Sequence, residues 1–537
     1  MRPEASGPPV RRAIPFLRIL LGSGRGWLLM AVPLMFVASG RNCIPIAAWI
    51  VPILMLRSLR NGTFQRFLAA YLASVLAWVF QFRGMVPVPP VMMLGLGLGY
   101  GFFAMVPFLA DRGIAPHIRG MASTLVLPCA AASLDFLLAH SPYGSWGSMA
   151  YSQYGDLPLM QLVSVTGLYG ITFLMAWTAA VANWAWERGF EPTHIRGGFL
   201  VWAGVLGGIL LGGGIRLWHV PEGPTVRVAS LSGPDVQVFP GRALMRRALA
   251  GHLSAQEIEA ARARGWYLAD DLLLHAAREA DAGAKVIFWG ETNAFCFSED
   301  EPIFLARAAK VAREKGVYLG LAIGIWHDGE PHPLENALIL MDPAGRVLWR
   351  YLKTRPVPGD ESRMSRRGEG RLQFATTAWG RISGVICFDA DFPSLLKQAG
   401  AGRADLLLLP SNDWKAIDPW HTQMAVFRAV EEGCNLVRQV SGGLSMAVDY
   451  RGCVLAAMDH VPMAENESLV SQVPIHGVTT FYSRIGDLFA WLTLAGLVSL
   501  AGSAWWLNRR DGGGPQWHSD PMDSRAPKPG GTGRKES

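Results

Sequence analysis

The sequence predicts a two-part fold, an α-helical transmembrane bundle of about eight spans joined to an α/β domain. The first observation is composition: half of the 537 residues are hydrophobic and only 17% are charged. The second is distribution, because 1–215 and 484–507 are apolar with sparse charges whereas 224–480 has the charge density of a soluble domain. The third is that apolar strand-like runs alternate with helical patterns within 224–480, which is typical of layered α/β domains.

Eight apolar stretches are at or near the length of about 20 residues that crosses the hydrocarbon core of a bilayer. We expect seven in an N-terminal bundle over 1–215, one C-terminal span over 484–507 and a disordered tail over 508–537. The N-terminus has no small-residue cleavage site after its apolar run, which indicates a retained anchor. The predicted spans are 15–39, 43–57, 65–82, 87–110, 119–139, 160–185, 197–215 and 484–507.

The positive residues predict the orientation of the bundle. With eight spans, most arginines in short connections fall on one side, which the positive-inside rule makes cytoplasmic. The 224–480 domain then lies on the opposite, extracytoplasmic side. The formal net charge is only +7, and its placement between apolar runs indicates membrane topology rather than binding to nucleic acid.

Within the α/β domain, strands and helices follow one another with short turns between them. The Asp342–Gly345 turn joins two strands into a hairpin. We expect strands at 225–230, 286–291, 317–325, 336–341, 346–351, 405–410, 436–439 and 444–449, and helices at 255–282, 301–315, 392–399 and 421–433.

Three reactive side chains stand at the ends of apolar runs in this domain. Glu291 follows Val286–Gly290, Lys353 follows Val347–Leu352, and Cys387 follows Ile382–Ile386. A carboxylate, an amine and a thiol at strand ends are the parts of a site for nucleophilic acyl transfer. A thiol with a pKa near ~8.5 needs a base or a cation to be nucleophilic at neutral pH. Glu291 is the candidate base and Lys353 the candidate cation.

The spacing of the other cysteines does not indicate a particular site. The sequence contains no CxxC or Cys/His spacing, so no metal site is expected. In an oxidising compartment, a disulfide among Cys296, Cys434 and Cys453 remains open.

The order Glu291, Lys353, Cys387 resembles the Glu-Lys-Cys triad of the nitrilase, or carbon–nitrogen hydrolase, superfamily, whose fold is an αββα sandwich. The stretches Ala150–Gln153, Gly167–Leu174 and Phe481–Asp487 resemble apolipoprotein N-acyltransferases. This resemblance covers nearly the whole chain.

The resemblance implies a role for each matching residue: Glu291 as general base, Lys353 as oxyanion stabiliser and Cys387 as nucleophile. Glu361 matches a supporting carboxylate, with Asp360 beside it as an alternative. The N–H of Phe388, directly after the nucleophile, is a natural oxyanion donor.

Several loops depart from the family pattern. Phe388-Asp389 replaces the usual Tyr-Glu, so Asp389 is a supporting residue that could take over the role of the glutamate. Asn412, Asp413 and Trp414 follow a buried strand and either line the pocket or form a structural turn. His421 is expected to start a helix rather than to act as a base.

The implied function is a membrane N-acyltransferase that moves a fatty acyl group from a phospholipid donor, through a Cys387 thioester, to the amine of a lipidated protein. The resemblance implies no metal and no organic cofactor. It implies a multi-pass protein of the bacterial inner membrane with a periplasmic catalytic domain. Two alternatives remain open: a membrane-tethered amidase or acyltransferase with another periplasmic substrate, and a catalytically inert scaffold.

Overall fold

The computed structural model describes residues 23–220, 223–234, 237–459 and 467–510. Two predictions therefore lie partly outside the described residues: the start of the first span, 15–22, and the tail from 511 onward. The last helix continues to Arg510, three residues beyond the predicted end of the final span.

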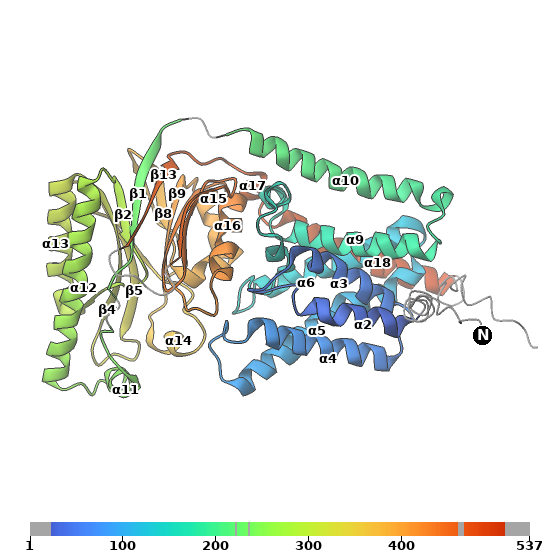
Figure 1. Cartoon of the computed structure of the whole chain (residues 1–537), viewed down its shortest axis with the longest axis horizontal. Helices are drawn as coiled ribbons and strands as arrows, with labels where there is room; N and C mark the ends of the chain where they lie inside the picture. Colours follow the sequence, from blue (N-terminus) through green and yellow to red (C-terminus); the bar gives the residue numbers. More distant parts are fainter. Residues whose placement is uncertain (1–22, 221–222, 235–236, 460–466, 511–537) are drawn as a thin grey trace, which may run out of the picture.

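The membrane half is helical throughout (Figure 1). Its longest helices pass between the α/β domain and the far end of the bundle, and short helices and turns connect them. The helices are α2 Gly24–Met35, α3 Pro45–Leu59, α4 Phe64–Phe82, α5 Pro90–Ile114, α6 Val126–Ala139, α7 Leu157–Met160, α8 Val163–Thr166, α9 Tyr169–Glu187, α10 Pro192–Trp218 and α18 Leu488–Arg510, with 3-10 turns η1 Ala115–His117, η2 Gly120–Leu125 and η3 Met149–Gln153.

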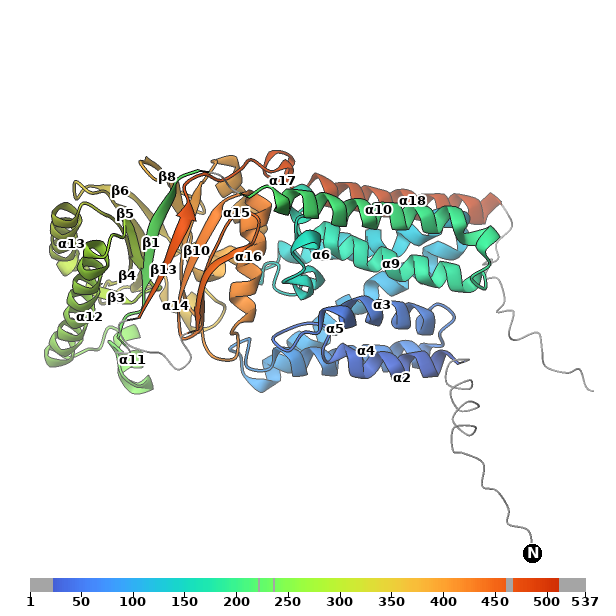
Figure 2. The same cartoon turned by 45° about the horizontal axis from the view of Figure 1, so that its top comes forward.

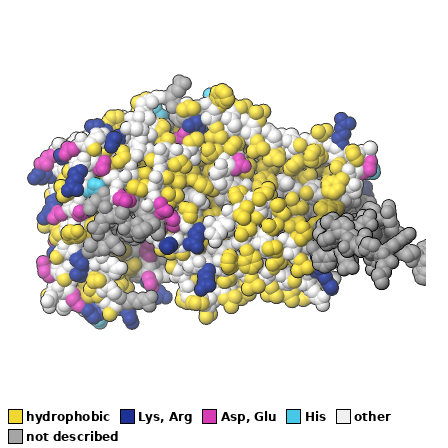
Figure 3. Space-filling view, viewed as in Figure 1, with side chains coloured by type: hydrophobic (Ala, Val, Ile, Leu, Met, Phe, Trp, Pro, Cys, Tyr) yellow, Lys and Arg dark blue, Asp and Glu magenta, His cyan; other side chains and the backbone are white. Residues whose placement is uncertain are grey.

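Among the described residues, four helices are long and apolar enough to cross a membrane, and a fifth span is counted if one bent helix pair is a single span. The four are Pro90–His117, Gly120–Ala139, Pro192–Trp218 and Leu488–Arg510. The count of eight spans stays a prediction. Space-filling Figure 3 shows hydrophobic side chains gathered over the bundle, and the charged side chains gathered mainly over the α/β domain.

The predicted span over 160–185 is not one straight helix, because the chain bends by 115° between Leu157–Thr166 and Tyr169–Glu187. Gly167 lies at the bend with φ of 66°, a conformation that favours glycine. The next amide, Leu168 N–H, donates to Glu431 Oε1 of the α/β domain at 2.8 Å. The bend therefore anchors the bundle to the α/β domain.

The α/β domain contains two β-sheets. One has the order β13-β1-β2-β4-β5-β6, with β3 also paired to β4; the other has the order β12-β11-β10-β9-β8-β7. The strands are β1 Thr225–Leu231, β2 Val286–Trp289, β3 Ala294–Phe297, β4 Tyr318–Trp326, β5 Leu334–Met341, β6 Val347–Leu352, β7 Phe374–Thr377, β8 Gly380–Gly384, β9 Leu406–Asn412, β10 Asn435–Ser441, β11 Leu444–Val448, β12 Val454–Asp459 and β13 Ser468–Pro474.

The two sheets lie face to face between two helical layers, as Figure 1 shows, so the predicted αββα sandwich is confirmed. Helices α12 Ala255–Asp281 and α13 Glu301–Lys315 form the outer layer, while α15 Pro393–Ala401 and α16 Trp420–Glu432 lie toward the bundle. The sequence reasoning did not predict the short helices α11 Arg242–Leu249, α14 Asp360–Met364 and α17 Phe481–Ile485, nor the 3-10 turns η4 Ser298–Asp300 and η5 Cys387–Asp391.

The order of strands brings several strand ends to one edge. β2 and β4 pair in parallel, while β5 pairs antiparallel with both β4 and β6. β6 therefore runs in the direction of β2 and ends at the same edge. In the second sheet, β8 and β9 also pair in parallel. The N–H of Asn412, the last residue of β9, donates at 3.0 Å to Glu291, two residues after β2, so the strand ends of the two sheets meet.

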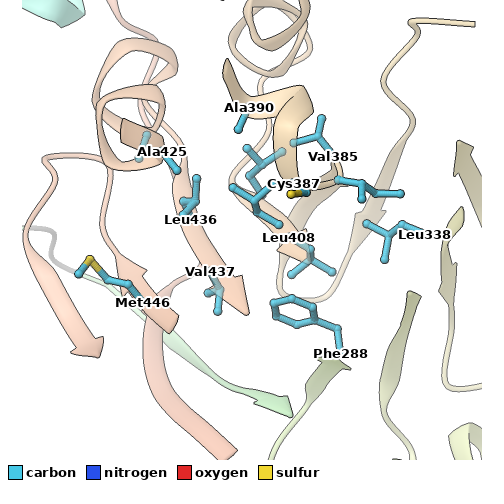
Figure 4. Packing of buried hydrophobic residues seen from close by; sticks show 14 of the residues in the cluster. Phe288, Leu338, Val385, Cys387, Ala390, Leu408, Ala425, Leu436, Val437 and Met446 are labelled. Carbon is cyan, nitrogen blue, oxygen red and sulfur yellow. The ribbon is translucent and has the colours of Figure 1, made fainter. Parts of the chain in front are cut away.

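The core between the sheets consists of fully buried aliphatic and aromatic side chains. Figure 4 shows Cys387 near Val385, Leu408 and Leu338, in the packing between elements of the two sheets. Two chain crossings join this domain to the bundle: α10 leads into β1, and α17 precedes α18 (Figure 2). The α/β domain is thus packed against one end of the bundle.

Candidate active site

The three residues predicted from the sequence stand just beyond strand ends. Glu291 lies two residues after β2, Lys353 directly after β6, and Cys387 three residues after β8, where it begins the 3-10 turn η5. Cys387 has φ of 49° and Thr292, next to Glu291, has φ of 52°. A left-handed backbone at a non-glycine residue is strained, and such strain clusters at functional sites.

Lys353 is the centre of a buried ion cluster. Its Nζ lies 2.7 Å from Glu291 Oε1 and 2.7 Å from Glu361 Oε1. Asn336 Nδ2 also donates to Glu291 Oε1 at 2.7 Å, and the Asn412 N–H donates to Glu291 Oε2 at 3.0 Å. The Glu291 side chain is therefore held at both oxygens.

Opposite charges around Lys353 keep it protonated. Burial alone lowers the pKa of Lys353, but the negative charges of Glu291, of Cys387 when it is ionised, and of Glu361 outweigh it, and the pKa ends well above its ordinary value. Burial raises the pKa of Glu361, although Lys353 opposes the rise. The ammonium of Lys353 is thus a fixed cation at the strand edge.

Cys387 is buried, with 3% of its surface exposed. Burial raises the pKa of its thiol well above the ordinary value, and the Glu291 carboxylate raises it further, whereas Lys353 lowers it. The neutral thiol is therefore the resting form, and a nucleophilic thiolate needs both a proton acceptor and nearby positive charge.

Two cavities meet at Cys387. The polar one, with a volume of about 310 Å³, is lined by Glu291, Lys353, Glu361, Asn412 and Cys387 among others. The apolar one, of about 50 Å³, lies toward the bundle and is lined by Cys387 together with Phe388, Trp414, His421, Trp146, Trp78 and Tyr100. The thiol is thus accessible from a charged side and from a hydrophobic side.

A third cavity continues into the membrane bundle. It has a volume of about 260 Å³, its lining is mostly apolar, and Trp78 and Tyr100 line both it and the apolar cavity. These two rings stack with centroids 4.8 Å apart and an interplanar angle of 10°. The stacked pair therefore stands between the reactive thiol and the space inside the bundle.

Asp389 supports the loop after Lys353 rather than lining any of these cavities. Its carboxylate accepts from Tyr351 Oη at 2.8 Å, from Arg355 N–H at 2.7 Å and from Thr354 N–H at 3.2 Å. Burial raises the pKa of Asp389 to about 6, partly opposed by Lys353. The carboxylate thus ties the segment that follows Lys353 to the turn that carries Cys387.

The three residues after β9 have separate positions. Asn412 lines the polar cavity, and Trp414 lines both the polar and the apolar cavity while its Nε1 donates to Gly84 O of the bundle at 2.7 Å. Asp413 is buried and paired with Arg438 Nη2 at 2.9 Å. Burial alone raises the pKa of Asp413, but Arg438 and His421 lower it well below its ordinary range.

Two further residues flank Cys387. Phe388 lines the apolar cavity, and its ring contacts Phe392 edge-on at 5.2 Å. His421 lies in the first turn of α16, as expected, but it also lines the apolar cavity and pairs with buried carboxylates. The sequence reasoning missed this second aspect of His421, because its partners Asp391, Asp413 and Arg438 come from three separate segments.

All six cysteines are free in the structure, including Cys296, Cys434 and Cys453. The open possibility of a disulfide among these three is therefore not realised. Burial raises the pKa of Cys296 to about 12 and that of Cys434 further. Both are buried residues of the core.

Each half of the chain matches a known protein family model. The carbon-nitrogen hydrolase family model matches residues 251–473, and the model of the apolipoprotein N-acyltransferase N-terminal domain matches residues 25–181. The chain is 29% identical over 474 residues to the apolipoprotein N-acyltransferase of Geobacter metallireducens, covering 81% of this chain and 85% of that one. It is 26% identical over 462 residues to that of Azotobacter vinelandii, covering 79% and 81%.

Among solved structures, an amidase from Nesterenkonia sp. is similar to half of the chain. The alignment covers 50% of this chain and 95% of the amidase, at 19% identity and a TM-score of 0.39.

The fold and the matched domains define a carbon–nitrogen hydrolase domain carried on a helical bundle with apolar, membrane-type helices. Since both domain models and the full-length relatives agree, the chain belongs to the apolipoprotein N-acyltransferase family, as a divergent member.

Proposed function

We propose that this protein is a membrane N-acyltransferase that moves a fatty acyl group from a phospholipid to the N-terminal amine of an apolipoprotein. We choose an apolipoprotein as the acyl acceptor because the relatives of this chain are named apolipoprotein N-acyltransferases. The observation that carries the proposal is that Cys387 lines both a polar cavity with Glu291 and Lys353 and an apolar cavity facing the bundle. A site that joins a charged centre to a hydrophobic pocket fits a substrate with a long acyl chain.

In the first half-reaction, Glu291 takes the proton of the Cys387 thiol and Sγ attacks the ester carbonyl carbon of the phospholipid. The carbon–oxygen bond then breaks, and the glycerol oxygen leaves with the proton from Glu291 as lysophospholipid. The product on the enzyme is a thioester, so the scheme is covalent catalysis in two steps.

In the second half-reaction, the neutral amine of the apolipoprotein attacks the thioester carbonyl. A carbon–nitrogen bond forms, the carbon–sulfur bond breaks, and Glu291 accepts the proton that the nitrogen loses. The proton then returns to Sγ. Glu291 is suited to both proton transfers because Asn336 and the Asn412 N–H fix its two oxygens.

Each half-reaction passes through a tetrahedral oxyanion. Lys353 has three N–H donors, and two carboxylate oxygens lie at 2.7 Å from its Nζ, so one donor is left for the oxyanion. The N–H of Phe388 is the second proposed donor. Losing one such donor typically costs about 3 kcal/mol of transition-state stabilisation.

The proposed location is the bacterial inner membrane, with the catalytic domain at 224–480 on the periplasmic side of a bundle formed by 1–215 and 484–507. The acyl chain of the donor then enters from the bilayer and lies along the apolar cavity lined by Trp146, Phe388 and Trp414. This arrangement keeps the ester carbonyl at Cys387 while the head group faces the polar cavity.

The direct test is transfer of a mass-tagged palmitoyl group from phospholipid to a synthetic diacylated lipopeptide by the purified full-length protein. The expected product is the triacylated lipopeptide, and Cys387→Ser abolishes it. Release of free fatty acid or ammonia without lipopeptide acylation would instead indicate a membrane-tethered amidase or another acyl acceptor. Rescue of a bacterial strain that lacks its own apolipoprotein N-acyltransferase tests the same claim in cells.

A further inference from the structure

His421 lies on the apolar side of Cys387 within a buried group of charges. One of its ring nitrogens, one Asp413 carboxylate oxygen and Cys387 Sγ all lie within 4.8 Å of one another. Its Nδ1 is 2.9 Å from Asp413 Oδ1 and 2.8 Å from Arg438 Nη2, and its Nε2 is 3.3 Å from Asp391 Oδ1. The ring also contacts Trp146 edge-on at 5.9 Å. His421 is therefore fixed on three sides and faces the nucleophile.

The surrounding charges determine its protonation state. The groups that face it are Cys387 and Asp391 from η5, Asp413 from the segment after β9, and Arg438 from β10. With a neutral ring, two carboxylates and one guanidinium leave a buried net negative charge; an imidazolium neutralises it. Burial and Arg438 by themselves lower the pKa of His421, but Asp413 and Asp391 outweigh them, and the pKa ends above its ordinary value.

On the polar side of Cys387, the positive charge of Lys353 is offset by neighbouring carboxylates. The Lys353 ammonium is 2.7 Å from both Glu291 and Glu361, so two carboxylates offset its single charge. Each catalytic cycle nevertheless forms a thiolate twice, before attack on the ester and when the amine displaces sulfur. A second cation close to Sγ would stabilise both states.

We propose that His421 is a positioning residue, held as an imidazolium by Asp391 and Asp413, that stabilises the Cys387 thiolate from the apolar side. It complements Lys353, which acts from the polar side. Its proton is not transferred; Glu291 remains the proton acceptor, and the His421 charge only offsets the negative charge that develops on Sγ. The inference deepens the proposed function, since it names a further residue on which Cys387 chemistry depends.

The test measures thiolate formation without any lipid substrate. The full-length protein in detergent is alkylated with iodoacetamide between pH 6 and 10, and the rate at Cys387 is followed by mass spectrometry of its peptide. For His421→Gln we expect alkylation at pH 7.5 to be at least about ten-fold slower, with the limiting rate at high pH unchanged. A ten-fold change corresponds to a pKa shift of about one unit, a modest effect for a unit charge this close.

His275→Gln is the matched control, because His275 is also a buried histidine of the catalytic domain, hydrogen-bonded to Ser468 at 2.8 Å and away from the site. Its alkylation profile should coincide with that of the unmodified protein. If His421→Gln does not fold, Asp391→Asn serves instead, since it keeps the ring and weakens only its charge; there we expect about three-fold slower alkylation at pH 7.5.

The proposal is overturned if the alkylation profile of His421→Gln coincides with that of the unmodified protein. If His421→Gln does not fold, the same outcome for Asp391→Asn overturns it. It is also overturned if His275→Gln shifts the profile equally, because the effect would then be general loss of structure. Failure of the proposed acyl transfer would not affect this readout, since alkylation needs neither phospholipid nor lipopeptide.

Discussion

The Lys353 ammonium lies 2.7 Å from Glu291 Oε1, and both side chains are almost fully buried. The contact joins the ends of two strands that are not neighbours in the sheet, β2 and β6. It fixes the proposed base and the proposed oxyanion donor relative to each other before any substrate arrives. Such preorganisation is the main way in which enzymes lower barriers by electrostatics.

Replacing Lys353 with Met should abolish thioester formation. The variant removes the cation but keeps the length of the side chain, so we expect acylation of Cys387 to slow by at least about 10²-fold. It should also lower stability, because Glu291 and Glu361 lose their buried partner, and breaking such a pair costs about 3–5 kcal/mol. The measurements are acyl-enzyme accumulation by mass spectrometry and thermal unfolding.

Two variants make this prediction specific. Lys310→Met changes an exposed lysine on α13 and should alter neither measurement. Lys353→Met combined with Glu361→Gln should recover part of the lost stability but none of the acylation, because it removes one of the two uncompensated charges. An unchanged acylation rate in Lys353→Met would contradict the proposed role.

Glu361 and Asp360 can be separated by experiment. Both line the polar cavity, but only Glu361 contacts Lys353, and its Oε2 also accepts from Val357 N–H at 2.9 Å. We expect Glu361→Gln to slow acylation by about 10- to 100-fold, because it alters the charge balance around Lys353. Asp360→Asn should stay within about three-fold. Equal effects in the two variants would show that the local charge matters, not the contact.

The narrow passage between the thiol and the bundle should control the use of long acyl chains. A Cβ at Gly147 would lie 2.8 Å from Tyr100 Cε1 and would displace the ring that stacks on Trp78. For Gly147→Val we expect acylation by a long-chain phospholipid to fall by at least about ten-fold, while acylation by a short butyryl ester stays within about three-fold, since overpacking affects the pocket and not the chemistry.

Gly99→Ala provides the control, because Gly99 is also in the bundle, next to Tyr100, and a Cβ there meets nothing within 4 Å. It should leave both rates unchanged. Equal losses with both donors in Gly147→Val would contradict the assignment of this passage to the acyl chain.

The arginine distribution predicts the topology of the chain. Fusions of alkaline phosphatase after residue 300 should be active, because this enzyme folds only outside the cytoplasm, and fusions after residue 190 should be silent. The opposite pattern would place the catalytic domain in the cytoplasm and rule out the proposed periplasmic acceptor.

The sequence predicted a layered α/β domain and its hairpin because their signals are local, whereas the αββα sandwich was implied by the family resemblance. Apolar runs ending in Glu291, Lys353 and Cys387 mark strand ends, and the Asp342–Gly345 turn marks the antiparallel pair. Periodicity and turn residues suffice for such elements. The meeting of the three side chains followed from the family resemblance. The structure gives it a geometric basis, because β2 and β6 end at one edge of the first sheet and Asn412, at the end of β9 in the second sheet, donates to Glu291 there.

Other features depend on contacts between distant segments and could not be predicted. The bend at Gly167 is held by Glu431, which lies more than 260 positions further along the chain. The buried partners of His421 come from three segments, and no spacing within the sequence marks them. Asp389 was predicted to support the site, but only the structure shows that it binds the loop after Lys353.

The central claim is that Cys387 carries the acyl group. The most direct measurement is mass spectrometry of the purified full-length protein after incubation with a phospholipid of defined acyl chains. We predict one acyl group on the peptide that contains Cys387, removed by hydroxylamine and lost on addition of a diacylated lipopeptide, which gains the same mass. Acylation that persists in Cys387→Ser, or an acyl-Cys387 that the lipopeptide does not discharge, would contradict the proposed mechanism.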